Sequence, residues 1–135
     1  MAVYLWAQEL DPEFPLAVLE YQVNGDGDRM HWHEHLEIAL CLEGTGRFLF
    51  GRRAQPVEPG DIFIVDNSQP HVALADPGGP LRLLLVLFRP ELVAAPGCRP
   101  FESGYLAPFH AADEHALERI PRTAPLAADI ATILR

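Results

Sequence analysis

A short stretch of the chain places two histidines and a glutamate at the spacing of a β-strand. His31 and His33 are two residues apart, and Glu37 follows His33 by four. In an extended strand, side chains two and four positions apart point to the same face, so these three can converge on one point. Two imidazoles and a carboxylate suit a divalent ion such as Zn, Fe, Mn or Ni. The best candidate for a fourth ligand is His71.

A second interpretation of these residues needs no metal, because His31 and His33 could instead bind an organic ligand or merely hydrogen-bond to one another. His35 has the strand parity of Glu37 and would intrude on the site unless the chain bends at residues 34–36; a place on the surface is the favoured interpretation. Trp32 lies on the opposite face and is expected to pack. The sequence shows no Ser-His-Asp set, phosphate-binding loop or redox cysteine pair, so no catalytic residue is assigned.

Short apolar segments separated by Gly and Pro turns predict an all-β fold, either a sandwich or a barrel. Residues 58–61 read Glu-Pro-Gly-Asp, which is typical of a type II turn with Pro at its second position and Gly at its third. Residues 52–55 are expected to form another turn. Strands are expected over residues 4–8, 16–23, 37–42, 47–51, 61–65, 72–75 and 81–88.

The strand over residues 37–42 has two unlike faces. If Glu37 points inward, Ala39 and Cys41 point inward with it, and these small side chains leave room for a ligand beside Ala39. The other face carries three large apolar side chains, which are not expected to face water together. We therefore expect either the C-terminal helices or a partner chain to cover Ile38, Leu40 and Leu42.

The character of the chain changes after residue 88. Residues 90–95 fit one helical turn, residues 96–108 a loop, and residues 111–119 a helix that Pro121 ends. A second helix is expected to begin at Pro125, with Thr123 or Ala124 as its cap. We expect a barrel domain over residues 1–95, then a loop and helices over residues 96–135. The apolar stripe of the last helix comprises Leu126, Ile130, Ile133 and Leu134, and the chain ends inside this pattern, as a truncated sequence would.

Composition limits the possible functions. A chain of 135 residues is expected to form one domain with a core of its own. Its net charge of −9 argues against nucleic-acid binding by this chain itself, since phosphate contacts need clustered basic residues. Cys41 and Cys98 are too few and too scattered for a secreted disulfide framework. No signal peptide or membrane span is evident, so the expected location is the cytoplasm.

The spacing of the histidine stretch resembles the first motif of the cupin superfamily. The anchors of that motif are matched by Gly25, His31, His33, Glu37 and Gly44. In the second cupin motif, Gly60 and His71 fall in register, whereas three expected residues are replaced by Asp66, Ser68 and Ala75. The resemblance covers roughly residues 16–90 and implies a double-stranded β-helix, a jelly-roll barrel with an open mouth. It also implies His31, His33, Glu37 and His71 as metal ligands.

Within that superfamily the chain resembles the N-terminal domain of AraC-type transcriptional regulators. The features that match are the histidine stretch, the Pro59-Gly60-Asp61 turn, Pro70-His71 and the helices that follow the barrel. This resemblance implies a small-molecule effector held in the barrel by His31, His33, Glu37, Ala39 and His71. It also implies a homodimer formed through C-terminal helices, and DNA contact only through a helix-turn-helix domain that this chain lacks. The alternative is a small metal-dependent cupin enzyme, such as a dioxygenase, decarboxylase or isomerase.

Overall fold

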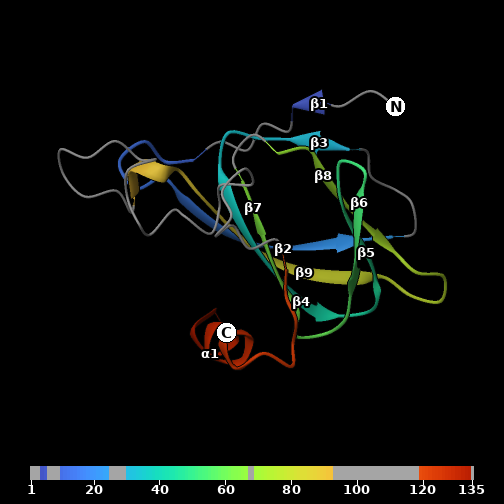
Figure 1. Ribbon diagram of the computed structural model, residues 1–135. Coiled ribbons are helices and arrows are strands. Elements are labelled where there is room, and N and C mark those ends of the chain that lie inside the picture. Colours follow the sequence, from blue (N-terminus) through green and yellow to red (C-terminus); the bar gives the residue numbers. More distant parts are fainter. Residues whose placement is uncertain (1–3, 6–9, 25–29, 67–68, 93–118, 135) are drawn as a thin grey trace.

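Two five-stranded β-sheets face one another in the computed structural model of this protein (Figure 1). The described residues are 4–5, 10–24, 30–66, 69–92 and 119–134. The first sheet has the strand order β1 (Tyr4–Leu5), β3 (His31–Trp32), β8 (His71–Ala75), β5 (Gly46–Phe50) and β6 (Arg53–Val57). The second has the order β10 (Arg119–Ile120), β7 (Ile62–Val65), β4 (Leu36–Glu43), β9 (Leu81–Phe88) and β2 (Leu16–Val23). A 3₁₀ turn (Pro90–Leu92) follows β9, and helix α1 (Pro125–Leu134) ends the described chain.

The predicted β fold with a C-terminal helix is confirmed, and most strands lie within a residue or two of their expected bounds. The type II turn is also confirmed: Gly60 has φ = 94°, and the Asp61 N–H donates to the Glu58 carbonyl at 3.0 Å. Only β1 and β3 pair in parallel; the other pairings between described strands are antiparallel. The fold is therefore assembled from neighbouring hairpins and crossovers, as expected for a jelly roll.

Two expectations about local structure were wrong. Residues 53–55 are not a turn but the start of β6, since Phe50 pairs with Arg53 across a two-residue turn in which Gly51 has φ = 60°. The strand tolerates Pro56 because β6 is an edge strand, so the backbone N–H groups on its outer side have no neighbouring strand to bind. Arg119 does not end a helix either: it pairs with Phe63 in β10. The rest of the expected helix, residues 111–118, lies outside the described residues.

The core has two parts, one on each face of the second sheet. The inner part lies between the sheets and includes Ala39 and Cys41, as the sequence predicted for that face of β4. The outer part lies between the second sheet and α1, which is drawn in red at the bottom of Figure 1. Leu40 is wholly buried in this outer part. The chain's own helix therefore covers much of the face that was expected to need a cover.

Helix α1 docks through only part of the apolar stripe that its sequence indicated, since Ile130 and Leu134 pack against the outer core. Leu126 and Ile133 are 49% and 80% exposed. The buried side chains are instead Ala127 and Ala131, while Ile130 and other partly buried residues pack beside them. No helix in the described part of the chain is long and apolar enough to cross a membrane.

Candidate metal centre

The predicted ligands come from both sheets and meet at one end of the barrel. His31 on β3 pairs directly with His71 at the start of β8 in the first sheet. Glu37 belongs to β4 in the second sheet, where it pairs with Val65 and Leu87. His33 lies between β3 and β4. All four side chains are buried, with exposed fractions of 9% or less.

These residues converge by a different route from the one that strand periodicity predicted. The chain leaves β3 after Trp32, bends at Glu34 and His35, and enters the second sheet at Leu36. His31 and Glu37 are therefore not on one continuous strand, and the bend carries the glutamate across to the other sheet. Strand alternation still predicted that the three side chains meet, because the bend returns Glu37 to the interior of the barrel.

The distances within the cluster are those of side chains that share one small space. One ligand atom from each of His31, His33 and His71 lies within 4.8 Å of the others. Glu37 Oε1 lies 3.1 Å from His33 Nε2 and 3.7 Å from His71 Nε2. Ligand atoms around a Zn ion at 2.0–2.1 Å are about 3 to 3.5 Å apart, so the carboxylate contacts are already near that range.

Backbone carbonyls fix which nitrogen of two histidines faces the cluster. The Nδ1 atom of His33 lies 2.9 Å from the His35 carbonyl oxygen, and Nδ1 of His71 lies 2.7 Å from the Gln69 carbonyl oxygen. A carbonyl only accepts, so each Nδ1 carries the proton and donates it. In a neutral ring the Nε2 atom is then unprotonated, with its lone pair toward Glu37. Such an outer hydrogen bond is the usual orientation of a metal-binding histidine.

The resulting cluster requires a positive charge at its centre. A carboxylate oxygen and an unprotonated imidazole nitrogen are both acceptors, so the 3.1 Å contact of Glu37 with His33 needs a proton or a cation between them. His71 Nε2 is also buried without a hydrogen-bond partner among the described residues. The three imidazoles therefore suit a divalent ion, and Glu37 contacts two of them as a candidate fourth ligand.

The electrostatics of Glu37 and His71 agree with this requirement. Burial tends to raise the pKa of Glu37, but the neighbouring His71 and His33 outweigh burial and hold that pKa well below its usual range. Burial tends to lower the pKa of His71, but the Glu37 carboxylate outweighs it and the net pKa is raised. In the absence of metal, a proton on His71 is thus favoured by the same carboxylate that would help to hold a cation.

Next to the cluster, the inside of the barrel is filled by aromatic rings. Phe48 stacks on Phe63 and on Phe50, with ring centroids 4.7 and 4.9 Å apart, and it lies nearly parallel to His71 at 6.0 Å. Ala39 is wholly buried in the same packed cluster. Its role as a ligand contact stays a prediction, and a ligand that touched Ala39 would have to share this space with the rings.

His35 is a residue whose position the sequence interpretation got wrong. It is 4% exposed rather than on the surface, and its ring centroid lies 5.1 Å from that of His33. Its parity with Glu37 was the signal that could have placed it inside, and the bend at residues 34–35 keeps it beside the cluster.

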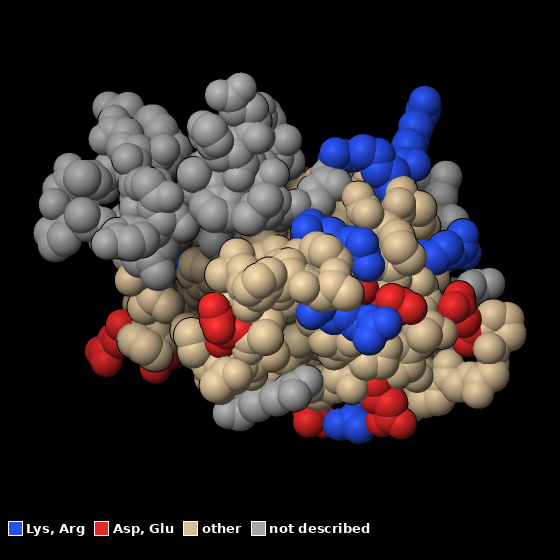
Figure 2. All heavy atoms as spheres, turned by 60° about the horizontal axis from the view of Figure 1, so that its bottom comes forward, with Lys and Arg blue, Asp and Glu red and all other residues tan. Residues whose placement is uncertain are grey.

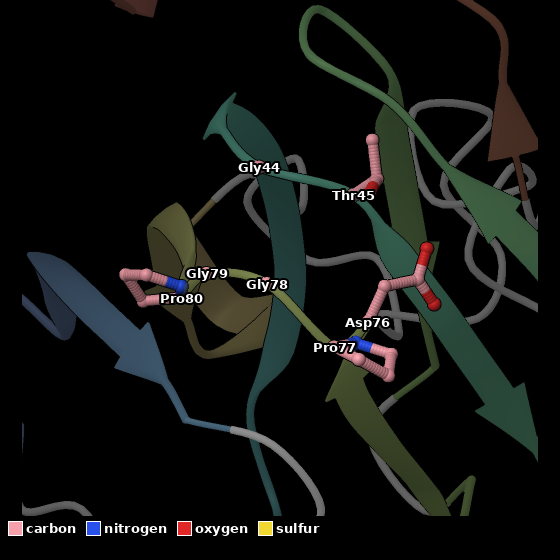
Figure 3. A pocket seen from close by; sticks show the side chains of 7 residues that line it. All are labelled: Gly44, Thr45, Asp76, Pro77, Gly78, Gly79 and Pro80. Carbon is pink, nitrogen blue, oxygen red and sulfur yellow. The ribbon is translucent and has the colours of Figure 1, made fainter.

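A shallow pocket of about 240 Å³ lies at the opposite ends of β4 and β8 from the cluster (Figure 3). It is formed by the turn after β4 and the turn between β8 and β9, and Asp76 is its one charged residue. Its lining comprises Gly44, Thr45, Asp76, Pro77, Gly78, Gly79 and Pro80. None of the predicted site residues contributes to it.

A jelly-roll barrel with a buried three-histidine, one-carboxylate cluster defines a ligand-binding cupin domain. Comparison with protein families gives the more specific assignment: residues 14–130 match the family described as "AraC-like ligand binding domain". The chain belongs to this family. The match begins just before β2 and reaches into α1, so it includes strands β2 to β10 and most of the helix.

The chain is similar to curated proteins that are named L-ectoine synthase. The chain is 32% identical over 92 residues to L-ectoine synthase from Halomonas elongata, covering 67% of this chain and 64% of that protein. It is 37% identical over 49 residues to L-ectoine synthase from Teredinibacter turnerae, covering 35% of this chain and 37% of the relative. The chain thus spans less than two thirds of the length of these relatives.

Solved structures support the barrel. The polyketide cyclase RemF from Streptomyces resistomycificus is 25% identical, with a TM-score of 0.51 over 58% of this chain and 60% of that one. A cupin 2 conserved barrel domain protein from Salinispora arenicola has a TM-score of 0.53 at 16% identity, over 58% of this chain and 67% of that one. At that identity the second likeness shows the fold alone.

Proposed function

We propose that this chain is the small-molecule-sensing and dimerisation domain of an AraC-type transcriptional regulator. The observation that carries the proposal is the family match over residues 14–130, which joins the barrel and α1 in one module. In this proposal His31, His33, Glu37 and His71 hold one divalent ion, Zn, Ni, Fe or Mn, and the effector binds at that point. DNA would be bound only by a helix-turn-helix domain elsewhere in the protein, and the regulator would act in the cytoplasm.

The chain's own residues give this site its preference for a ligand. His33 and His71 present Nε2 to the centre because their Nδ1 protons are donated to carbonyls. A divalent ion with one carboxylate and neutral histidines keeps one net positive charge, which favours an effector with an anionic oxygen. When bound, the ion would supply Lewis acidity to that oxygen.

Metal titration tests the proposed centre. We expect one Zn per chain by calorimetry, and loss of that binding in the His31→Ala, His33→Ala double variant. Glu34→Gln is a matched control, because Glu34 is exposed and lies between the ligands in sequence. Unchanged metal content in the double variant would remove the metal from the proposal.

The dimer is proposed to form through the exposed side of α1. Leu126 and Ile133 leave much apolar surface uncovered on one short helix. We expect sedimentation to show a dimer for the chain and a monomer for Ile133→Asp, with an unchanged melting temperature at low concentration. A monomer in both cases would contradict the proposal, and a dimer in both would place the interface elsewhere.

A metal-dependent enzyme is the second candidate, favoured by the similarity to L-ectoine synthase. The reverse reaction, in which L-ectoine is consumed, can be followed by NMR in the presence of protein loaded with Zn, Ni, Fe or Mn. As a sensor, the chain should leave L-ectoine unchanged, and any binding should appear only as a shift in melting temperature. Consumption of L-ectoine that is lost in the His31→Ala, His33→Ala variant would favour the enzyme.

A further inference from the structure

A buried carboxylate joins the barrel to the segment that leads into α1. Asp61 is wholly buried at the end of the type II turn. Its Oδ2 accepts the N–H of Glu58 at 3.0 Å and an Nη2 hydrogen of Arg119 at 2.9 Å. Its Oδ1 accepts the N–H of Arg122 at 2.6 Å. One side chain thus holds its own turn, β10 and the approach to α1; we refer to Asp61, Arg119 and Arg122 as the Asp61 latch.

The latch matters because it adds polar contacts to the apolar packing of α1 on the outer core. A helix of ten residues is marginal alone, so its docking must hold it. Its buried side chains are Ala127 and Ala131, whose area is small, and Ile130 and Leu134 are only partly buried against the outer core. A pocket of about 290 Å³ also remains between the turn and the helix, lined by Gly60, Arg122, Ala127, Ala128, Ala131 and Thr132.

The charges on this side of the molecule are consistent with a polar attachment. Figure 2 turns the α1 side toward the reader and shows basic and acidic side chains lying close together beside a broad uncharged area. Arg119 is mostly buried against Asp61, whereas the Arg122 guanidinium meets Glu58 at 3.4 Å with both side chains about half exposed. The buried pair should dominate, since exposed ion pairs contribute little.

The latch is also connected to the candidate metal centre through β4 and β7. The Cys41 N–H donates to the Asp61 carbonyl, and the Gly60 N–H donates to the Cys41 carbonyl, both at 2.9 Å. From there the two strands pair as far as Glu37 and Val65. Glu37 and the Asp61 turn therefore lie at the two ends of one hydrogen-bonded ladder.

We propose that the Asp61 latch sets how firmly α1 docks on the barrel, and that a cation at the histidine cluster acts on this docking through the β4–β7 ladder. The second half rests on the proposed metal centre. A ligand-dependent change would then reach α1 because the latch bonds join the approach to the helix directly to the end of this ladder.

Hydrogen exchange of α1 tests the latch itself. In Asp61→Asn, the side-chain NH₂ group would face N–H donors at a position where the carboxylate accepts hydrogen bonds. We therefore expect the backbone amides of α1 (Pro125–Leu134) to exchange about tenfold faster or more. Amides in β4 and β9 should keep their protection. Arg119→Gln removes the ion pair alone and serves as a milder second variant should Asp61→Asn fail to fold.

Arg82→Gln is the matched control for the latch, because it removes an exposed ion pair with Glu43 on the same sheet. It should leave α1 exchange unchanged. Exchange in α1 that is the same in wild type, Asp61→Asn and Arg119→Gln would overturn the latch.

Zinc tests the coupling. In wild type, saturating Zn should change α1 exchange at least about threefold, and Arg119→Gln should bind Zn equally well but lose that change. Zn binding with no effect on α1 would overturn the coupling while leaving the metal centre intact. Absence of Zn binding would instead overturn the metal centre and the coupling together, and the exchange of the Asp61 and Arg119 variants would still decide the latch.

Discussion

The two faces of strand β4 are built on different principles. The inner face carries Glu37, a buried charge that is compensated by histidines from elsewhere in the chain. The outer face carries Leu36 and Leu40, which are buried with other apolar groups beneath α1. One strand can therefore contribute a ligand of the candidate metal centre from one face and apolar core residues from the other. Substitutions on the two faces should therefore differ in kind as well as in size.

The largest expected effect is on the outer face. Leu40 is wholly buried, so Leu40→Ala should lower the free energy of unfolding by about 3 kcal/mol, through lost burial and the cavity left behind. Urea denaturation measures this. The affinity for Zn of the folded variant should be unchanged, since Leu40 points away from the cluster. Val18→Ala on the same sheet is the control, because Val18 is 55% exposed and should cost less than about 0.5 kcal/mol.

On the inner face, Glu37→Gln should change the pH dependence of stability in metal-free protein. The pKa of Glu37 is lowered from its ordinary 4.5, so this group stabilises the fold above pH 4.5 and less as the pH falls. The pKa of His71 is raised from 6.5, so its stabilising effect is present below pH 6.5 and is lost as the pH rises through the raised value. The pair should therefore contribute most between pH 4.5 and 6.5.

Glu37→Gln should cost about 2 kcal/mol at pH 5.5, the size of a charged hydrogen bond, and less at pH 8. Urea midpoints of EDTA-treated protein at the two pH values measure the difference. Glu34→Gln, an exposed change three residues away, should show no such pH dependence. An equal cost of Glu37→Gln at both pH values would mean that the His71–Glu37 contact does not govern the titration.

A smaller effect is expected for Ala39→Phe, which adds a ring beside Phe48 and Phe63. Because Ala39 is wholly buried, overpacking should cost about 1.5 kcal/mol. Ala54→Phe on exposed β6 is the control and should be nearly neutral. An unchanged melting temperature for Ala39→Phe would instead reveal the open space over Ala39 that the sequence predicted.

Periodicity and turn chemistry were enough to predict the inner and outer faces of β4. Ala39 and Leu40 went to the expected sides because a strand alternates strictly, and the turn at Gly60 formed because its backbone needs positive φ. The edge strand β6 was missed since an edge tolerates the polar residues and the proline that otherwise indicate a turn.

The candidate site was predictable as a set but not as a geometry. Spacing brought His31, His33 and Glu37 together, yet the bend that moves Glu37 to the second sheet has no clear signal in a single sequence. The backbone carbonyls that orient His33 and His71 carry no side-chain signature at all. The burial of His35 depends on the same bend. The surface position was therefore the wrong choice for His35, although strand parity with Glu37 indicated the interior.

The smallest expected effect decides which side of α1 meets the barrel. Periodicity predicted that Ile130 and Ile133 lie in the same apolar stripe. In the structure Ile130 packs against the outer core, whereas Ile133 is 80% exposed. Ile130→Ser should therefore cost about 1 kcal/mol by loss of buried area, and Ile133→Ser less than about 0.5 kcal/mol. Urea denaturation should be done at several protein concentrations, because a dimer through α1 would add a concentration-dependent contribution to Ile133. A larger cost for Ile133 than for Ile130 at the lowest concentration would mean that the side of the helix bearing Ile133 faces the barrel.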